Sequence, residues 1–236
     1  MADAMLEVQG LRAGYGPAEI LFGVSLTLRR GQVAALMGRN GAGKSTTLKT
    51  IMGLLTPRGG CIRFAGQEIS GLPPFRIARL GLGYVPEDRR IFTDLTVTEN
   101  LEVGRRAARG RAPWTPERLF AIFPNLAEMR HRRAAAMSGG EQQMLTIART
   151  LMGNPEAVLL DEPSEGLAPV IVEQMAEAVL RMKQEGIAVL LSEQSLDFAA
   201  AVADHAYVIE RGEIRYAGSM AALEADDAIR QSYLTV

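Results

Sequence analysis

A glycine-rich segment that ends in lysine and serine carries the clearest chemical signal in the sequence. Residues 38–45 read GRNGAGKS and match the phosphate-binding pattern G-x-x-x-x-G-K-[ST] at every fixed position. Glycines let the backbone turn its N–H groups toward an anion, and a helix that begins near Lys44 would add the positive end of its dipole. We expect Lys44 to contact the β- and γ-phosphates of a nucleotide and the hydroxyl of Ser45 to ligate Mg²⁺.

The whole segment is therefore interpreted as a nucleotide site. The residues expected to contact the nucleotide are Gly38, Arg39, Asn40, Gly41, Ala42, Gly43, Lys44, Ser45 and Thr46. The alternative is a glycine-rich turn with a chance lysine. It is disfavoured because a short apolar run precedes the segment and a helical pattern follows it.

Two adjacent carboxylates follow a second apolar run. Residues 157–160 are apolar, and Asp161 and Glu162 come directly after them. In a doubly wound sheet, ligands bind at the carboxyl ends of the strands, so these acids should face the phosphate-binding segment. We expect Asp161 to hold Mg²⁺ and Glu162 to polarise an attacking water, a role typically worth about 10²–10⁴ in rate. A solvent-exposed strand end is the alternative interpretation.

A second glycine-rich helix start lies upstream of the carboxylates. Ser138, Gly139, Gly140 and Glu141 precede an apolar helical pattern, and Ser138 is suited to cap the helix. The positive end of that helix would form another anion site. The chain therefore has one phosphate-binding lysine but two glycine-rich helix starts.

These motifs resemble those of the ATP-binding cassette (ABC) ATPases, whose signature is L-S-G-G-Q/E, and the resemblance covers essentially the whole chain. It implies that two subunits pack head to tail and that Ser138, Gly139, Gly140 and Glu141 act on ATP held by the partner subunit. It further implies that Tyr15 stacks on adenine, that Glu87 ligates Mg²⁺ at the Q-loop position, and that Gln194 occupies the position of the catalytic switch histidine.

The sequence departs from the commonest family pattern at three positions. Glu87 replaces a glutamine, which adds negative charge near the γ-phosphate. Gln194 replaces a histidine, so a protonatable switch residue is not expected, and neither His131 nor His205 lies at a matching position. The D-loop, residues 164–167, lacks its aspartate.

Five segments point to one branch of the family. The second ATP-binding subunit of high-affinity branched-chain amino-acid importers has similar sequences at residues 85–92, 95–101, 141–145, 166–169 and 193–194. Urea-importer ATPases share much of this pattern. The resemblance implies a second ATP-binding subunit, identical or different, transmembrane permease subunits and, indirectly, a periplasmic solute-binding protein.

The elements that must position these residues are predicted to form an α/β fold. Residues 33–37, 157–160 and 187–191 are predicted to be buried strands, and residues 205–209 and 213–217 a hairpin. We expect a single domain over residues 1–236. It would be a P-loop NTPase core of the ABC type with a mostly parallel sheet, an N-terminal antiparallel β portion, and a helical subdomain inserted at about residues 88–153.

Composition and charge limit where the protein can be located in the cell. The net charge is −1 and the single cysteine cannot form an intrachain disulfide. Neither a secretion signal nor an apolar run of about 20 residues is found. We therefore expect a cytoplasmic protein, held at the inner face of the cell membrane through permease subunits.

Two further readings stay open. Eight arginines lie from Arg105 to Arg133, a composition compatible with a soluble ABC ATPase that acts on nucleic acid. We favour the interpretation that these arginines form a solvated helix face, and we expect no nucleic-acid partner. A plain P-loop kinase is disfavoured by the second glycine-rich helix start.

Overall fold

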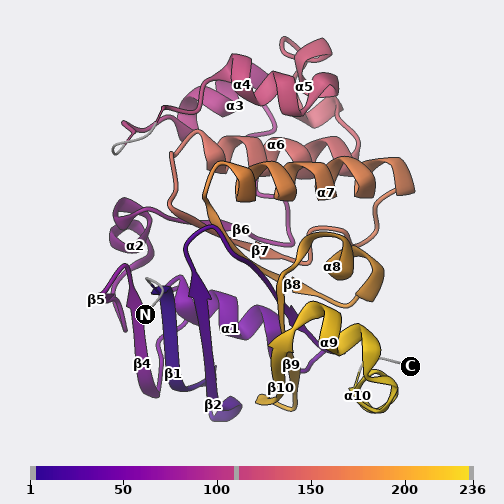
Figure 1. Ribbon diagram of the computed structural model, residues 1–236. Coiled ribbons are helices and arrows are strands. Elements are labelled where there is room, and N and C mark those ends of the chain that lie inside the picture. The colour runs from indigo at the N-terminus through magenta and orange to yellow at the C-terminus, as the bar shows by residue number, and fades with distance from the viewer. Residues whose placement is uncertain (1–3, 109–111, 234–236) are drawn as a thin grey trace.

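The computed structural model describes residues 4–108 and 112–233, so Arg109 and Arg111 of the arginine-rich segment lie outside the described residues. Strands and helices alternate along most of the chain (Figure 1). The strands are β1 (Ala4–Tyr15), β2 (Ala18–Arg29), β3 (Val33–Met37), β4 (Gly59–Phe64), β5 (Gln67–Glu68), β6 (Leu82–Val85), β7 (Ala157–Asp161), β8 (Ala188–Glu193), β9 (His205–Glu210) and β10 (Glu213–Ser219). The α-helices are α1 (Lys44–Ile51), α2 (Pro74–Leu80), α3 (Val97–Gly104), α4 (Pro116–Ile122), α5 (Pro124–Glu128), α6 (Gly139–Leu151), α7 (Pro169–Gln184), α8 (Leu196–Val202), α9 (Met220–Ala225) and α10 (Asp227–Tyr233).

The central sheet has six strands in the order β10-β9-β3-β8-β7-β6. Its strands run parallel except for β10, which forms the predicted hairpin with β9. The apolar runs are explained by burial on both faces. In β3, for example, Val33, Ala35 and Met37 join one hydrophobic core, whereas Ala34 and Leu36 join the other. The predicted α/β class with a mostly parallel sheet is confirmed.

Strand β8 continues two residues beyond the apolar run that predicted it. Ser192 and Glu193 extend the strand because they still pair with Leu36 and Met37 of β3. On the other side of β8, the ladder with β7 ends at the pair Asp161 and Ser192. Polar side chains of β8 therefore reach the carboxyl edge of the sheet, beside the acids that follow β7.

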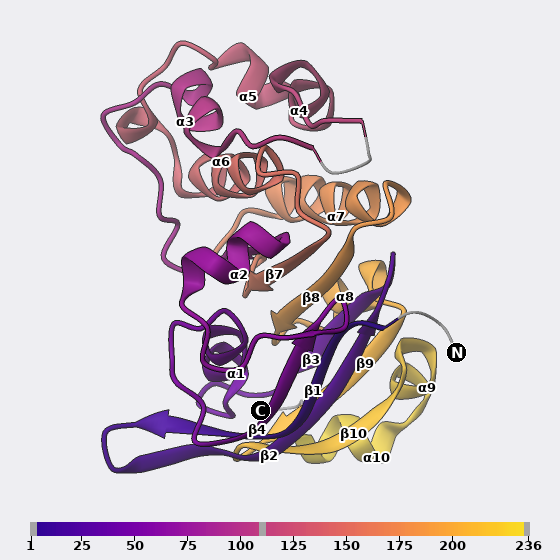
Figure 2. The same cartoon turned by 90° about the vertical axis from the view of Figure 1, so that its left-hand side faces the viewer.

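A second, antiparallel sheet has the strand order β2-β1-β4-β5, as expected for the N-terminal β portion. Helix α1 lies between the two sheets, because it contacts β1 and β2 on one side and β7 and β8 on the other. Figure 2 shows this arrangement from the side, with the long β1–β2 hairpin extending below α1. The helix that follows the phosphate-binding segment is thus fixed on both sides.

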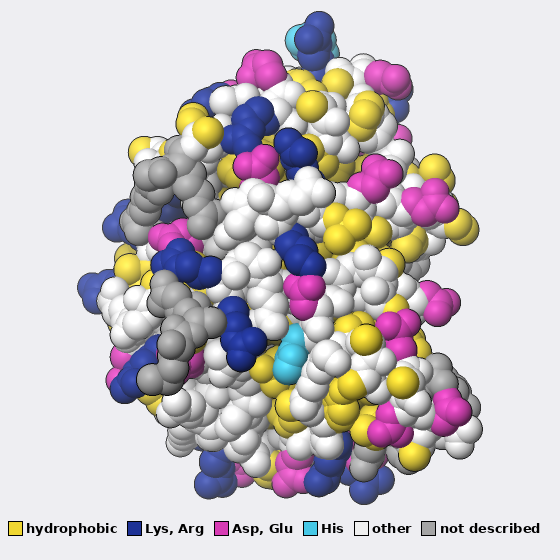
Figure 3. Space-filling model, viewed as in Figure 1, with side chains coloured by type: hydrophobic (Ala, Val, Ile, Leu, Met, Phe, Trp, Pro, Cys, Tyr) yellow, Lys and Arg dark blue, Asp and Glu magenta, His cyan; other side chains and the backbone are white. Residues whose placement is uncertain are grey.

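The described residues between β6 and β7 contain helices and no strand, and α3, α4 and α5 form a layer above α6 and α7 (Figure 1). Trp114 and Phe123 are buried there. Basic and acidic side chains are interspersed over this part in Figure 3, and Arg105 and Arg118 form ion pairs with Glu102 and Glu185. Among the described residues, no helix is both long and apolar enough to cross a membrane.

Candidate nucleotide site

The phosphate-binding segment forms the loop between β3 and α1. Gly43 precedes the helix with φ of 113°, a conformation that favours glycine, and a Cβ there would lie 2.9 Å from Leu21 Cδ2. No side chain caps α1. The first N–H groups of the helix therefore point into the loop without a side-chain acceptor, which is the arrangement that binds a phosphate.

Lys44 is buried at the centre of this loop, with 3% of its surface exposed. Its Nζ donates to the carbonyl oxygens of Gly38 at 2.7 Å and Arg39 at 3.2 Å. It also lies 3.0 Å from Oε1 of Glu162. The ammonium group is thus held between the loop and the carboxylate of Glu162, which follows β7.

Asp161 accepts hydrogen bonds from three hydroxyl groups. Ser45 Oγ and Ser192 Oγ both donate to Oδ1 at 2.8 Å, and the hydroxyl of Tyr84 donates to Oδ2 at 3.0 Å. Burial, together with the charge of Asp161, raises the pKa of Tyr84, so the phenol stays protonated and acts as a donor. Because Ser45 and Asp161 are in contact, their oxygens can share one cation.

Glu162 occupies a strained backbone position beside Asp161. Its φ is 47°, which is uncommon for a residue with a side chain and is typical of functional sites. Besides its ion pair with Lys44, it accepts a hydrogen bond from Gln194 Nε2 at 2.9 Å. Burial raises the pKa of Glu162, but hydrogen bonds from Glu165, Lys44 and Gln194 outweigh burial and hold it below its ordinary value. The carboxylate is therefore ionised near neutral pH.

A cavity of about 440 Å³ lies over the phosphate loop and these acids. It is lined by Tyr15, Ile20, Asn40, Gly41, Gly43, Lys44, Ser45, Thr46, Glu87, Glu162 and Glu165. Tyr15 is 49% exposed, and its ring can be covered by a planar ligand. A hydrogen bond with Glu162, together with burial, raises the pKa of Glu165 to about 7.

The second glycine-rich helix start lies apart from this cavity. Ser138 caps α6, as predicted: its hydroxyl accepts from Glu141 N, and Glu141 Oε2 accepts from Ser138 N at 2.7 Å. A Cβ on Gly139 would lie 2.1 Å from Nη1 of Arg89, so the arginine lies directly against the glycine. Among the described residues, none from Ser138 to Glu141 lines the cavity.

Most of the residues predicted for one site therefore meet around one cavity. Gly38 and Arg39 contribute carbonyl groups to Lys44, and Ala42 is buried in the loop beneath it. The sequence assigned no role to Tyr84, Glu165, Ser192 or Glu193. Two of them lie in segments that carry the family resemblance, Glu165 in the D-loop and Glu193 beside Gln194, and Ser192 directly precedes Glu193.

This arrangement fits a magnesium nucleotide. The uncapped helix start and buried Lys44 suit the phosphates, and Tyr15 suits an adenine ring. Ser45 and Asp161 can supply two ligands to Mg²⁺, which usually takes its remaining ligands from phosphates and water.

Comparisons with known proteins agree with this geometry. The family model described as ABC transporter matches residues 21–165. The high-affinity branched-chain amino acid transport ATP-binding protein BraG of Pseudomonas aeruginosa is 42% identical over 231 residues, covering 98% of this chain and 99% of that protein. A protein of Archaeoglobus fulgidus named "Probable branched-chain amino acid transport ATP-binding protein LivF" is 35% identical, covering 91% of this chain and 92% of that protein.

A solved structure gives the same result for the fold. The crystal structure of an ATP-binding cassette of an ABC transporter in its ADP conformation superposes with a TM-score of 0.81 at 28% identity, covering 97% of each chain. With the family model spanning most of the chain and the relatives aligned over nearly its whole length, the chain belongs to the ABC transporter family and is one of its ATP-hydrolysing subunits.

Proposed function

We propose that this chain is the ATP-hydrolysing subunit of an importer for branched-chain amino acids. The observation that carries the solute class is the 42% identity to BraG over nearly the full length of both chains. The expected partners are a second ATP-binding subunit and transmembrane permease subunits, which would hold the chain at the inner face of the membrane. A periplasmic solute-binding protein would act on the permease.

The position of each group around the cavity supports a role for it in the proposed reaction. When bound, ATP supplies the terminal phosphoryl group that is transferred to water, and Mg²⁺ supplies positive charge to the phosphate oxygens. Tyr15 stacks on the adenine ring, and the loop from Gly38 to Thr46 binds the phosphates through its N–H groups and Lys44. Ser45, Asp161 and Glu87 would provide oxygen ligands for the cation.

Glu162 and Gln194 have different roles in hydrolysis. The ionised Glu162 accepts the proton of the attacking water, a function supported by its lowered pKa and its place in the cavity. The amide of Gln194, already 2.9 Å from Glu162, orients the carboxylate and the water by hydrogen bonds. An amide does not titrate, so no switch residue changes charge near neutral pH.

Two substitutions of Gln194 test this division. Gln194→Ala is expected to lower kcat by about threefold to tenfold, because an orienting hydrogen bond is worth roughly 0.5–1.5 kcal/mol. Gln194→His should retain most of the activity, since an imidazole donates a similar bond, and should add a pH dependence at about pH 6–7. Steady-state ATPase rates from pH 5.5 to 9 measure both effects. A Gln194→Ala variant as inactive as Glu162→Gln would contradict the assignment.

The second glycine-rich helix start completes the site of a partner subunit. Ser138, Gly139, Gly140 and Glu141 lie outside the cavity of their own chain, which supports a role across a head-to-tail dimer. The helical subdomain at about residues 88–153 carries this motif. The position of the subdomain relative to the sheet therefore decides whether the motif completes the partner's nucleotide site.

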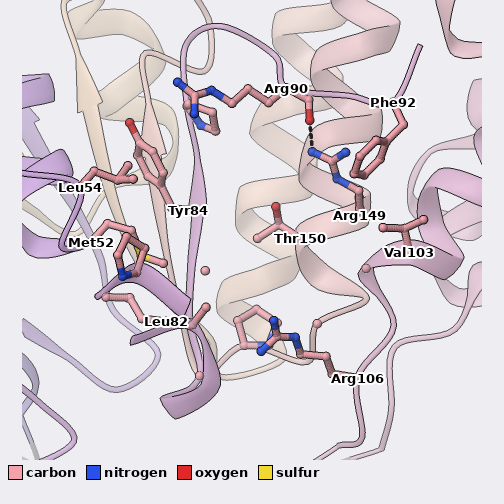
Figure 4. Close-up of a pocket in the computed structure, with 18 residues that line it drawn as sticks. Met52, Leu54, Leu82, Tyr84, Arg90, Phe92, Val103, Arg106, Arg149 and Thr150 are labelled. Carbon is pink, nitrogen blue, oxygen red and sulfur yellow. Dashed lines mark hydrogen bonds between the residues drawn. The ribbon is translucent and has the colours of Figure 1, made fainter. Parts of the chain in front are cut away.

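A groove between the sheet and the helical subdomain supports permease docking. It has a volume of about 380 Å³ and runs between α2 and β6 on one side and α3 and α6 on the other. Figure 4 shows Leu54 and Tyr84 on one wall and Phe92, Val103 and Arg149 on the opposite wall. Phe92 is 48% exposed and lies under the guanidinium of Arg149. An exposed aromatic ring beside a cation is typical of an interface anchor.

Phe92→Ser is expected to weaken binding of the permease subunits by about tenfold or more, because a buried aromatic side chain contributes roughly 1.5–3 kcal/mol. Basal ATP hydrolysis by the isolated subunit should be unchanged. Phe22→Ser is a matched control, since Phe22 is 50% exposed on β2 and does not line the groove. Retention of this chain on immobilised permease subunits measures the effect, and equal retention of both variants would contradict groove docking.

The solute class is tested by stimulation of ATP hydrolysis. With permease subunits and the periplasmic binding protein present, leucine, isoleucine or valine should raise the ATPase rate, and urea should not. Stimulation by urea alone would replace the branched-chain assignment with the alternative importer class.

A further inference from the structure

The last two residues of β8, Ser192 and Glu193, and the next residue, Gln194, bond to residues at and just beyond the end of β7. Ser192 donates to the carboxylate of Asp161 and accepts from the backbone N–H of Glu162, and Gln194 donates to the carboxylate of Glu162. Glu193 lies between them and contacts neither carboxylate by a hydrogen bond. Its partner is Ser164, two residues after Glu162.

The Glu193 carboxylate joins two turns. Oε1 accepts from the backbone N–H of Ser164 at 3.1 Å and from its hydroxyl at 2.6 Å. Oε2 accepts from the backbone N–H groups of Gln194 at 3.0 Å and Ser195 at 3.3 Å. One oxygen is thus bound to the loop after β7, and the other to the turn after β8.

This bridge is buried. Glu193 is 2% exposed, and the four groups that donate to it are neutral, namely three backbone N–H groups and the hydroxyl of Ser164. Burial raises its pKa, and the hydrogen bonds from Ser164, Ser195 and Gln194 oppose that change. A buried carboxylate is costly unless its oxygens are hydrogen-bonded, so the four donors account for its stability at this position.

The bridge lies just beyond the last backbone hydrogen bond between the two chain segments, which Glu162 N donates to the carbonyl oxygen of Ser192 at 3.2 Å. The β7–β8 ladder ends at Asp161 and Ser192, one residue before Glu162 and two before Gln194. Glu162 has φ of 47°, and a residue in that region keeps its conformation only when its surroundings fix it. Beyond the ladder, Ser192 fixes the backbone N–H of Glu162, and Glu193 fixes Ser164 against Gln194.

We propose that Glu193 is a positioning residue for ATP hydrolysis. It holds the turn that carries Gln194 at a fixed distance from the loop that carries Glu162, so that the amide of Gln194 meets the carboxylate of Glu162. This inference rests on the proposed function, because it assigns hydrolysis to Glu162 and Gln194. Glu193 does not line the nucleotide cavity and acts through Gln194.

Glu193→Gln tests the proposal with an isosteric side chain. An amide nitrogen cannot accept a hydrogen bond, so one of the two turns loses its acceptor. The expected loss in kcat is about threefold to tenfold and no larger than that of Gln194→Ala, while KM for ATP stays within about twofold because the phosphate loop is unchanged. Glu210→Gln at the end of β9 is the control. Equal kcat in Glu193→Gln and wild type overturns the proposal.

A double-mutant cycle separates positioning from general destabilisation. In the Gln194→Ala background, Glu193→Gln should change kcat by less than about twofold, since the group through which it acts is already missing. If the loss in kcat of the double variant equals the product of the losses of the two single variants, the proposal is overturned. If Glu193→Gln does not fold, Ser164→Ala replaces it, because it keeps the carboxylate and removes its shortest hydrogen bond; it should lower kcat and show the same non-additivity.

Failure of this inference is distinguishable from failure of the proposed function. If wild type hydrolyses ATP and Glu162→Gln does not, the site assignment stands whatever Glu193→Gln shows. If Glu162→Gln retains full activity, the hydrolysis assignment itself is wrong.

Discussion

Glu162→Gln is expected to lower kcat for ATP hydrolysis by about 10²–10⁴-fold while ATP still binds. The amide has the shape of the carboxylate but cannot accept the proton of the attacking water, and the lowered pKa of Glu162 shows that the ionised form is the one present near neutral pH. Single-turnover hydrolysis measures the chemical step. Glu177→Gln on α7 is the control, because Glu177 is exposed and does not line the nucleotide cavity.

The same variant also tests whether ATP causes two subunits to associate. With hydrolysis blocked and the signature residues Ser138 to Gly140 acting on the partner's nucleotide, Glu162→Gln should associate when ATP is added in the presence of the cognate second ATPase subunit. Sedimentation velocity detects the change. Monomers alone at saturating ATP would contradict completion of the site across two subunits.

Lys44→Ala should weaken ATP binding by at least about 100-fold, because the backbone cradle alone lacks the charge that neutralises the β- and γ-phosphates. The change also leaves Glu162 without its cationic partner at 3.0 Å. Equilibrium binding of a fluorescent ATP analogue measures the loss. Lys49→Ala, in the last turn of the same helix, controls for the charge of the chain. Near-normal affinity in Lys44→Ala would show that another group binds the phosphates.

The parts of the site that the sequence predicted are those encoded by local patterns. Lys44 and Ser45 lie in one short loop, and the start of their helix follows from the glycines before it. Ser138 and Glu141 form a capping box that can be read from their spacing alone. Asp161 and Glu162 follow an apolar run whose length fits a buried strand. Each of these signals spans fewer than about ten residues.

The missed residues depend on the order of the strands, which no local pattern encodes. Tyr84 reaches Asp161 because β6 and β7 are neighbours, and Ser192 reaches it because β7 and β8 are neighbours. The apolar pattern ended before Ser192, so the sequence did not place Ser192 and Glu193 within a strand. Continued pairing with β3 extends β8 through both residues and brings Glu193 to the loop at Ser164.

Uptake of labelled leucine into proteoliposomes tests the central claim most directly. The vesicles would contain the permease subunits, the second ATPase subunit and either wild-type chain or Glu162→Gln, with the binding protein outside and ATP inside. The account predicts ATP-dependent leucine accumulation with the wild-type chain and background uptake with Glu162→Gln. No accumulation with a wild-type chain that hydrolyses ATP, or equal accumulation with both chains, would contradict it.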